Sequence, residues 1–392
     1  MLDVTVQTGS VITHRLETGV LTLNLQAEPE KELFRLAERV NPKRSFLFVS
    51  TVLGRHIPVR PSDHMGAVKE LVQRLGGVRI PGPILVVGYA ETAVGLGAAV
   101  ARELASRRSG HDLLYLSTTR HPVPGREWVR FSEGHSHATE HHVLRPDPHA
   151  AISSPDSTLV LVDDETTTGA TFAALTQALL RAGVRFARVI LVTLTDWSDG
   201  AAVRAVSALD PAIPVSCVSL MRGSWSWAAD PSVQLPELPG PISPAYPEWV
   251  PSSGVSPRDG VRDWSGAETD RLAAQLDPQP GEQILIIGTG EQIWAPMLLG
   301  ERLEQGGAEV RVIATTRSPI LPGEVIQHKL TFPDHFGIGV PMYLHNIPPH
   351  PQGRVVVMTE TGADRICPAL RTHLGRGIII DGSGQLTEFC ES

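Results

Sequence analysis

The sequence predicts an α/β protein with a doubly wound, mostly parallel sheet, followed by a second, degenerate α/β domain of similar order. Two observations carry this prediction. Short β-branched runs alternate with Ala- and Leu-rich segments, and the alternation returns after a proline-rich stretch. The chain has 392 residues, 42% hydrophobic and 19% charged, which excludes disordered and fibrous classes. At about 150 residues per domain, this length favours two or three domains.

The first part of the chain contains four apolar runs that indicate strands and two segments that indicate helices. The runs are residues 84–87, 113–117, 158–162 and 189–193, and the helical segments are residues 93–106 and 171–182. Prolines without periodicity between residues 231 and 260 indicate a linker. We therefore expect a first domain at residues 1–230, a linker at 231–260 and a C-terminal domain at 261–392.

Charge and cysteine content exclude several classes of partner. Lys and Arg number 34 against 42 Asp and Glu, so the net charge is 34 − 42 = −8 and attracts neither nucleic acid nor an anionic membrane. Three cysteines without CxxC spacing favour a reducing compartment. The start of the chain lacks the pattern of an export signal, and no apolar run approaches the roughly 18 residues of a membrane span. We expect a cytoplasmic protein.

The second half repeats four features of the first half in the same order. An apolar strand ends in glycine and is followed three residues later by a glutamate, then come a helix, a Thr-Thr-Arg tripeptide, and a further strand leading to Glu-Thr. The pairs are Gly88 and Gly288, Glu91 and Glu291, residues 118–120 and 315–317, and residues 165–166 and 360–361. We interpret this order as a duplicated α/β unit. In that alignment, Met358 and Thr359 replace the acids Asp163 and Asp164.

The strongest chemical signal lies between an apolar strand and a helix. It consists of Asp163, Asp164, Glu165, Thr166, Thr167, Thr168, Gly169, Ala170 and Thr171. A short loop of hydroxyls and glycine that opens a helix presents free backbone N–H groups and the positive end of the helix dipole to one point, which suits a phosphate. Because Gly169 has no Cβ, a phosphate oxygen can approach the backbone of the loop closely. The loop therefore predicts a phosphate site.

Two adjacent carboxylates would repel a phosphate bound beside them unless they contact hydroxyl groups or a cation. A ribose phosphate supplies the hydroxyls, and magnesium bound to them would supply the cation. Asp163 and Asp164 would then hold the 2′ and 3′ hydroxyls while the threonine loop holds the 5′-phosphate. The alternative is a plain strand-to-helix turn with Thr168 as the N-cap and solvated acids.

This motif resembles the signature of the type I phosphoribosyltransferases, in which two acids follow an apolar strand and precede a Thr-rich glycine loop. The resemblance implies the same fold, a Mg²⁺ cofactor, and phosphoribosyl pyrophosphate (PRPP) as the donor, with Asp163 and Asp164 on the ribose and residues 167–171 around its 5′-phosphate; Glu165 and Thr166, between them, are also expected to contact the substrate. Residues 88–93, 133–138 and the second Thr-Thr-Arg resemble a narrower group, found with tellurite-resistance and stress gene clusters, in which a C-terminal domain follows the transferase domain.

The resemblance also implies a pyrophosphate turn after the first core strand. Its candidates are Tyr89, Ala90, Glu91 and Thr92. Glu91 departs from the usual basic pattern and would repel pyrophosphate unless it binds magnesium or the incoming nucleophile. Packing of the flanking glycines is the alternative explanation for this turn. The glycine pairs at residues 95–97 and 288–290 each lack the third glycine or alanine of a dinucleotide-binding fingerprint.

Further candidates are cations and a flap. A leaving pyrophosphate develops negative charge, and two arginines could stabilise it: Arg120, at a strand end, and Arg55, in an N-terminal hood segment over the sheet. The alternative for both is that they are ordinary surface arginines, such as those that cap strand ends.

His135 and His137 share a strand face with Glu133, a spacing that permits a metal site. A flap that closes over the substrate is the favoured interpretation of this segment.

The sequence thus predicts a magnesium-dependent enzyme that moves a phosphoribosyl group from PRPP to an unidentified nucleophile, for which nitrogen is favoured. A sensor that binds PRPP or a nucleotide without turnover is the second hypothesis, and a nicotinamide-dependent oxidoreductase ranks last. Expected partners are PRPP and a small-molecule acceptor, with no nucleic acid and no membrane, and with a homodimer left open. For the C-terminal copy, ligand binding, completion of the substrate pocket and a pure packing role all stay open.

Overall fold

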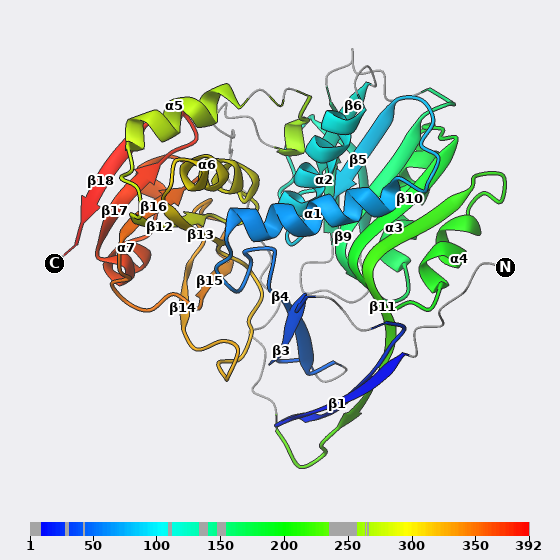
Figure 1. The fold of residues 1–392 in the computed structure, drawn as a ribbon, viewed down its shortest axis with the longest axis horizontal. Coiled ribbons are helices and arrows are strands. Elements are labelled where there is room, and N and C mark those ends of the chain that lie inside the picture. Colours follow the sequence, from blue (N-terminus) through cyan, green and yellow to red (C-terminus); the bar gives the residue numbers. More distant parts are fainter. Residues whose placement is uncertain are drawn as a thin grey trace.

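The computed structural model describes residues 9–27, 31–41, 44–108, 112–132, 140–146, 154–234, 257–262, 264 and 266–391. Two parallel sheets dominate it, one in each half of the chain (Figure 1). Within these residues, no helix is both long and apolar enough to cross a membrane.

The first sheet has seven strands in the order β1-β2-β11-β10-β9-β5-β6. Their bounds are β1 Ser10–Leu16, β2 Gly19–Leu25, β5 Ile84–Gly88, β6 Leu113–Ser117, β9 Thr158–Thr166, β10 Arg188–Asp196 and β11 Val215–Ala229. The neighbours from β11 to β6 pair in parallel, and β2 and β1 add an antiparallel edge. The predicted, mostly parallel α/β sheet is confirmed.

Helices cover both faces of this sheet. The helices are α1 Pro61–Leu75, α2 Val94–Arg107, α3 Ala170–Arg181 and α4 Ala201–Ser207. Alternate residues of β9 point to opposite faces: Val160 and Val162 pack with α1 and α2, whereas Leu159 and Leu161 pack with α3 and α4. Burial on both faces explains why β9 begins as an unbroken apolar run.

The second sheet repeats the strand order of the first. Its order is β13-β12-β16-β17-β18, with β12 Gln283–Gly288, β13 Glu309–Ala314, β16 Arg354–Met358, β17 Arg376–Ile380 and β18 Leu386–Cys390. Strands β13-β12-β16-β17 therefore correspond to β6-β5-β9-β10. Each half also has an antiparallel hairpin outside its sheet: β7 Glu127–Ser132 with β8 Glu140–Leu144, and β14 Lys329–Pro333 with β15 Pro341–His345.

Hydrogen bonds repeat along with the strands. The Thr118 amide donates to the Gly88 carbonyl at 2.9 Å, and the Thr315 amide donates to the Gly288 carbonyl at the same distance. The Thr118 hydroxyl accepts from the Ala90 amide at 2.8 Å, as the Thr315 hydroxyl does from its counterpart Gly290. The C-terminal half is thus a second α/β unit of the same order, as the sequence repeat predicts.

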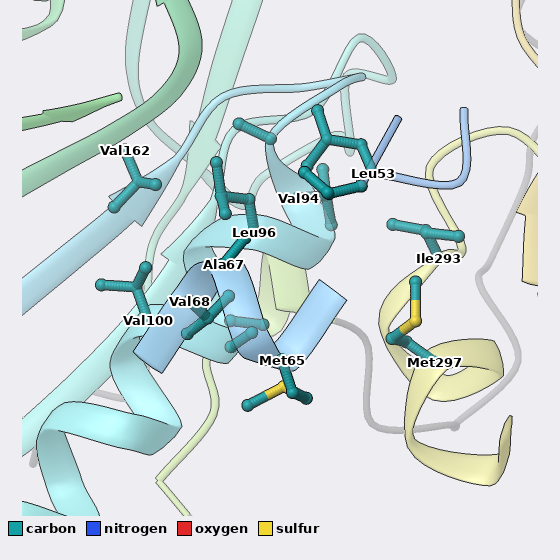
Figure 2. Close-up of a cluster of buried hydrophobic side chains, with 14 of the residues drawn as sticks. Leu53, Met65, Ala67, Val68, Val94, Leu96, Val100, Val162, Ile293 and Met297 are labelled. Carbon is teal, nitrogen blue, oxygen red and sulfur yellow. The ribbon is translucent and has the colours of Figure 1, made fainter. Parts of the chain in front are cut away.

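The two halves share one hydrophobic core. Figure 2 shows Ile293 and Met297 of the second half beside Leu53 and Val94 of the first. Ile293 precedes α6 (Trp294–Gln305), which contacts α1 and α2, while α5 (Ala267–Leu276) packs on α6 and α7 (Pro368–Leu374) lies against β14 and β17. A Cβ on Gly300 of α6 would lie 2.8 Å from Pro61 of α1, so the helices meet closely. The halves therefore pack together as a single body.

Segments outside the sheets complete the first half. The hairpin of β3 (Phe34–Glu38) and β4 (Phe46–Ser50) packs on Trp197 and Trp225 in an aromatic cluster. Most of the predicted linker lies outside the described residues. In its last part, η1 (Pro257–Asp259), Pro257 and Arg258 are buried, and Val261 pairs with Tyr115 of β6, so the chain enters the second half along the first sheet.

Candidate functional site

The acid pair lies on the last part of β9, at the carboxyl end of the first sheet. Asp163 and Asp164 are half-buried, and the Asp164 amide donates to the Asp163 carboxylate at 3.0 Å. Loss of solvent, together with the neighbouring charge of Glu165, raises the pKa of Asp164 from 3.8 to about 6. The site therefore holds a carboxylate whose negative charge the surrounding protein only partly compensates.

The loop after β9 leaves backbone donors open. Within the described part of the chain, the amides of Thr167, Thr168 and Gly169 have no hydrogen-bond partner, and the Thr168 hydroxyl accepts from the Ala170 amide at 3.3 Å. Thr168 is exposed, and α3 begins at Ala170. Three consecutive free amides at a helix N-terminus form an anion cradle. This geometry is what the sequence predicts for a phosphate site.

Gly169 has a packing reason that the sequence does not reveal. Its φ is +75°, in the left-handed region, and a Cβ there would lie 2.3 Å from the Ala202 Cα of α4. Any side chain would push the loop away from α4. The missing Cβ therefore serves close packing of the loop, in addition to the access for a phosphate that the sequence predicts.

The turn after β5 lies directly beside the acid pair. The Tyr89 amide donates to the Val162 carbonyl at 3.1 Å, one residue before Asp163. The Ala90–Glu91 peptide bond in this turn is cis. The amides of Glu91 and Thr92 have no partner among the described residues, and α2 begins soon after. The turn thus offers a second set of free donors at the same sheet edge.

Tyr89 supports this turn from beneath. Its ring is buried and packs edge-on against Phe131 and Phe172, and its hydroxyl donates to the Thr171 carbonyl at 3.4 Å. The side chain therefore connects the turn to α3 and lies in the core. The side chains of Tyr89 and Ala90 are buried, so these two residues border the site through their backbone.

Arg55 contacts the turn through its side chain. The Arg55 side chain is 2% exposed and donates to the carbonyls of Glu91, Gly290 and Thr315, the last two at 2.6 and 2.8 Å. Burial lowers the pKa of Arg55, and the charges of nearby carboxylates, including Asp164, oppose this shift. Arg55 thus joins the turn to the second half.

Arg120 follows β6 at the edge of the same site. Its backbone amide donates to a carboxylate oxygen of Glu291 at 2.6 Å, while its guanidinium donates to the Glu140 carbonyl at 3.2 Å. The side chain therefore extends toward β8, whose first residue is Glu140. The strand end is positioned by the second half, and the guanidinium is directed at the β7–β8 hairpin.

Glu165 contacts the hood hairpin through a residue that the sequence analysis missed. The Arg44 guanidinium pairs with both carboxylate oxygens of Glu165, at 2.9 and 3.0 Å, and lies 4.9 Å from the centre of the Phe46 ring. Arg44 sits among other charged residues without periodicity, so no sequence signal distinguishes it. The pair attaches the β3–β4 hairpin to the site, next to Asp163 and Asp164.

Comparisons with known families identify this arrangement. Residues 33–224 match a family model described as phosphoribosyl transferase, and residues 254–370 match one described as the TRSP domain C-terminal to that transferase domain. Residues 33–224 therefore belong to this phosphoribosyltransferase family, and a TRSP domain follows them. No curated protein sequence matches the chain.

Several solved structures resemble the transferase domain. Adenine phosphoribosyltransferase from Rhodothermus marinus is 20% identical, with 48% of this chain and 93% of that chain covered and a TM-score of 0.33. The enzyme from Trypanosoma brucei is 15% identical, with 48% and 76% covered and a TM-score of 0.33. The enzyme from Saccharomyces cerevisiae is 13% identical, with 48% and 94% covered and a TM-score of 0.31. These values carry no information about the substrate of this transferase.

The TRSP domain lacks the acids at the corresponding position. There, Thr359 hydrogen-bonds Thr361 at 3.0 Å, and the intervening Glu360 pairs with Arg258 of η1 through both carboxylate oxygens. Arg258 is 1% exposed and also lies 3.7 Å from Glu291. A guanidinium thus pairs with two carboxylates at the positions of the second copy that repeat Glu91 and Glu165.

The remaining predicted residues of the transferase are His135 and His137. Both lie outside the described residues, together with Glu133. The nearby His141 is described: its Nδ1 hydrogen-bonds the Thr118 hydroxyl at 2.9 Å, which in turn accepts from the Ala90 amide. Among the residues that the structure describes, no three His, Cys, Asp or Glu side chains form a metal-binding group.

Proposed function

We propose that this transferase moves a 5-phosphoribosyl group from PRPP to a nitrogen nucleophile of a small-molecule acceptor. The bond from C1 of the ribose to the pyrophosphate oxygen breaks, a bond from C1 to nitrogen forms, and the nitrogen loses a proton. The observation that carries the proposal is the placement of two adjacent acids beside two sets of backbone amides that have no partner among the described residues. A nucleotide-like or stress-related biosynthetic pathway, with its tellurite link, belongs to the same proposal.

Each part of the site has one task in this reaction. The amides of residues 167–169 bind the 5′-phosphate, and Asp163 and Asp164 accept hydrogen bonds from the 2′ and 3′ hydroxyls. The amides of Glu91 and Thr92 bind the pyrophosphate. Because the ribose becomes cation-like as pyrophosphate departs, positioning and charge stabilisation supply the rate enhancement, and no covalent nucleophile is required.

The acid pair also fits Mg²⁺. This ion binds through one or two carboxylates and takes its other ligands from water and substrate phosphates. Asp163 and Asp164 are adjacent, and the raised pKa of Asp164 reflects a charge that a divalent cation would compensate. The two carboxylates would hold the ion, and its charge would stabilise the leaving pyrophosphate.

The test is calorimetric binding of PRPP in the presence of MgCl₂. Wild-type protein should bind, and the double variant Asp163→Asn with Asp164→Asn should lose most of the affinity. Asp270→Asn, which removes an exposed carboxylate paired with Arg302 far along the chain, is the matched control and should bind like wild type. Equal binding by the double variant and the wild type would remove the proposal.

A second measurement separates an enzyme from a sensor. The missing basic residue in the turn is the feature that favours a protein that binds PRPP without turnover. Incubation with labelled PRPP and fractionated small-molecule extract should give pyrophosphate and a ribosylated product detectable by mass spectrometry. Binding without release of pyrophosphate from any fraction would indicate the sensor.

A further inference from the structure

The two halves exchange a reciprocal contact that uses the repeated sequence features. Glu91 of the first half accepts hydrogen bonds from the Thr316 hydroxyl and the Arg317 amide, both at 3.2 Å. Glu291 of the second half accepts from the Thr119 hydroxyl at 2.7 Å and from the amide of the residue after it at 2.6 Å. Each glutamate is thus bound by the Thr-Thr-Arg tripeptide of the other copy.

The contact at Glu91 also neutralises its charge. The Arg317 Nε lies 3.3 Å from a carboxylate oxygen of Glu91, and the side chains are 16% and 12% exposed, so solvent screens the pair only partly. The Arg317 Nη2 lies 3.3 Å from the Nε2 of His121, whose pKa burial holds well below 6.5, so His121 is neutral and accepts this hydrogen bond. The positive charge of Arg317 is therefore directed at Glu91.

This arrangement resolves the conflict at the pyrophosphate turn. An acid in a turn that receives an anion would weaken binding by like-charge repulsion. Here the carboxylate is engaged by the second half, while the amides of Glu91 and Thr92 stay free within the described part of the chain. Arg55 fixes the same turn by binding the Glu91 carbonyl and two carbonyls of the second half. The charge and the position of the turn thus both depend on the C-terminal half.

We propose that the C-terminal half acts as a built-in partner subunit, in which Thr316 and Arg317 neutralise Glu91 so that the turn can accept the pyrophosphate of PRPP. This inference rests on the proposed function. Since the second copy lacks the acids and holds Arg258 at its centre, its contribution to the reaction is to position the first site. Arg317 is accordingly a positioning residue that acts through Glu91.

The test compares binding of two ligands by calorimetry with MgCl₂ present. In Arg317→Gln, the Kd for PRPP should rise by about tenfold or more, because the unpaired Glu91 repels pyrophosphate in a partly buried site. The Kd for ribose 5-phosphate, which has no pyrophosphate, should stay within about twofold of wild type. Arg317→Lys keeps the charge and should retain most of the PRPP affinity.

A matched control separates this effect from loosening of the interface. Glu301→Gln breaks the ion pair between Arg102 of α2 and Glu301 of α6, at 2.6 Å and 23% and 25% exposed, which joins the same halves away from the turn. It should leave both dissociation constants unchanged. Thermal unfolding of all variants checks that each is folded.

The decisive result is rescue by the double variant Glu91→Gln with Arg317→Gln. If Arg317 acts by neutralising Glu91, removing both charges should return the Kd for PRPP to within about threefold of wild type. A double variant as weak as Arg317→Gln alone, or equal loss for ribose 5-phosphate, would overturn the inference. If the wild type fails to bind PRPP, the proposed function itself fails, which is a distinct outcome.

Discussion

Removal of the Asp164 charge should stabilise the protein in a pH-dependent manner. The pKa of this carboxyl is raised from 3.8 to about 6, chiefly by loss of solvent. Between about pH 4 and pH 6 the folded state therefore holds a proton that the unfolded state releases, and stability falls as the pH rises through this window. Two pKa units correspond to about 3 kcal/mol, so above pH 6 ionised Asp164 costs up to about that amount.

The variant Asp164→Asn has no such charge. Its free energy of unfolding, measured by urea denaturation, should exceed that of the wild type by about 1–3 kcal/mol at pH 7.5, and the gain should shrink toward zero by pH 4. The same substitution at exposed Asp270 is the control and should show no such trend. A difference between Asp164→Asn and wild type that is the same at pH 4 and pH 7.5 would refute the assignment of a desolvated acid.

Three further substitutions test packing and charge pairing. Gly169→Ala should lower the free energy of unfolding by about 2–4 kcal/mol, because the added Cβ meets the α4 backbone, whereas Gly183→Ala, at φ +86° with no atom within 4 Å, should cost about 1 kcal/mol. Arg258→Met leaves two buried carboxylates without their cation and should cost about 3–5 kcal/mol, against less than about 1 kcal/mol for Arg271→Ala in an exposed pair. Arg44→Gln should cost about 1–2 kcal/mol in urea denaturation and change tryptophan fluorescence, because its guanidinium lies 5.5 Å from the Trp225 ring. Equal losses within either matched pair, or an unchanged spectrum for Arg44→Gln, would contradict these assignments.

The duplication explains which repeated residues have a role in the first site. Glu291 and the second Thr-Thr-Arg contact the transferase half, whereas the acids that would serve a second site are absent from the C-terminal copy. A degenerate copy can therefore lose its own chemistry while it still holds the turn and the strand end of the other copy. The contacts across the interface are what the structure shows for those residues.

Local chemistry made much of the site predictable. The run from Asp163 to Thr171 combines a buried strand, two acids and a glycine loop, and each property depends on neighbours in the chain. The succession of strands and helices along the second half was predictable for the same reason, because its apolar runs repeat in order. Arg44 was not predictable, since only the fold brings it to Glu165 across 121 residues.

The sequence by itself determined the alternation of strands and helices, the threonine and glycine loop before α3 and the existence of two similar units, because these follow from residue periodicity and short-range backbone chemistry. The tertiary structure alone decided how the units meet. Contacts such as that between Glu91 and Arg317 join residues 226 positions apart in sequence, and their pairing depends on packing of α1, α2 and α6 in one core. From the sequence alone, the charge of Glu91 is expected to repel an anion bound at the turn. The pairing of Glu91 with Arg317 from the other half, which only the tertiary structure reveals, opposes that repulsion.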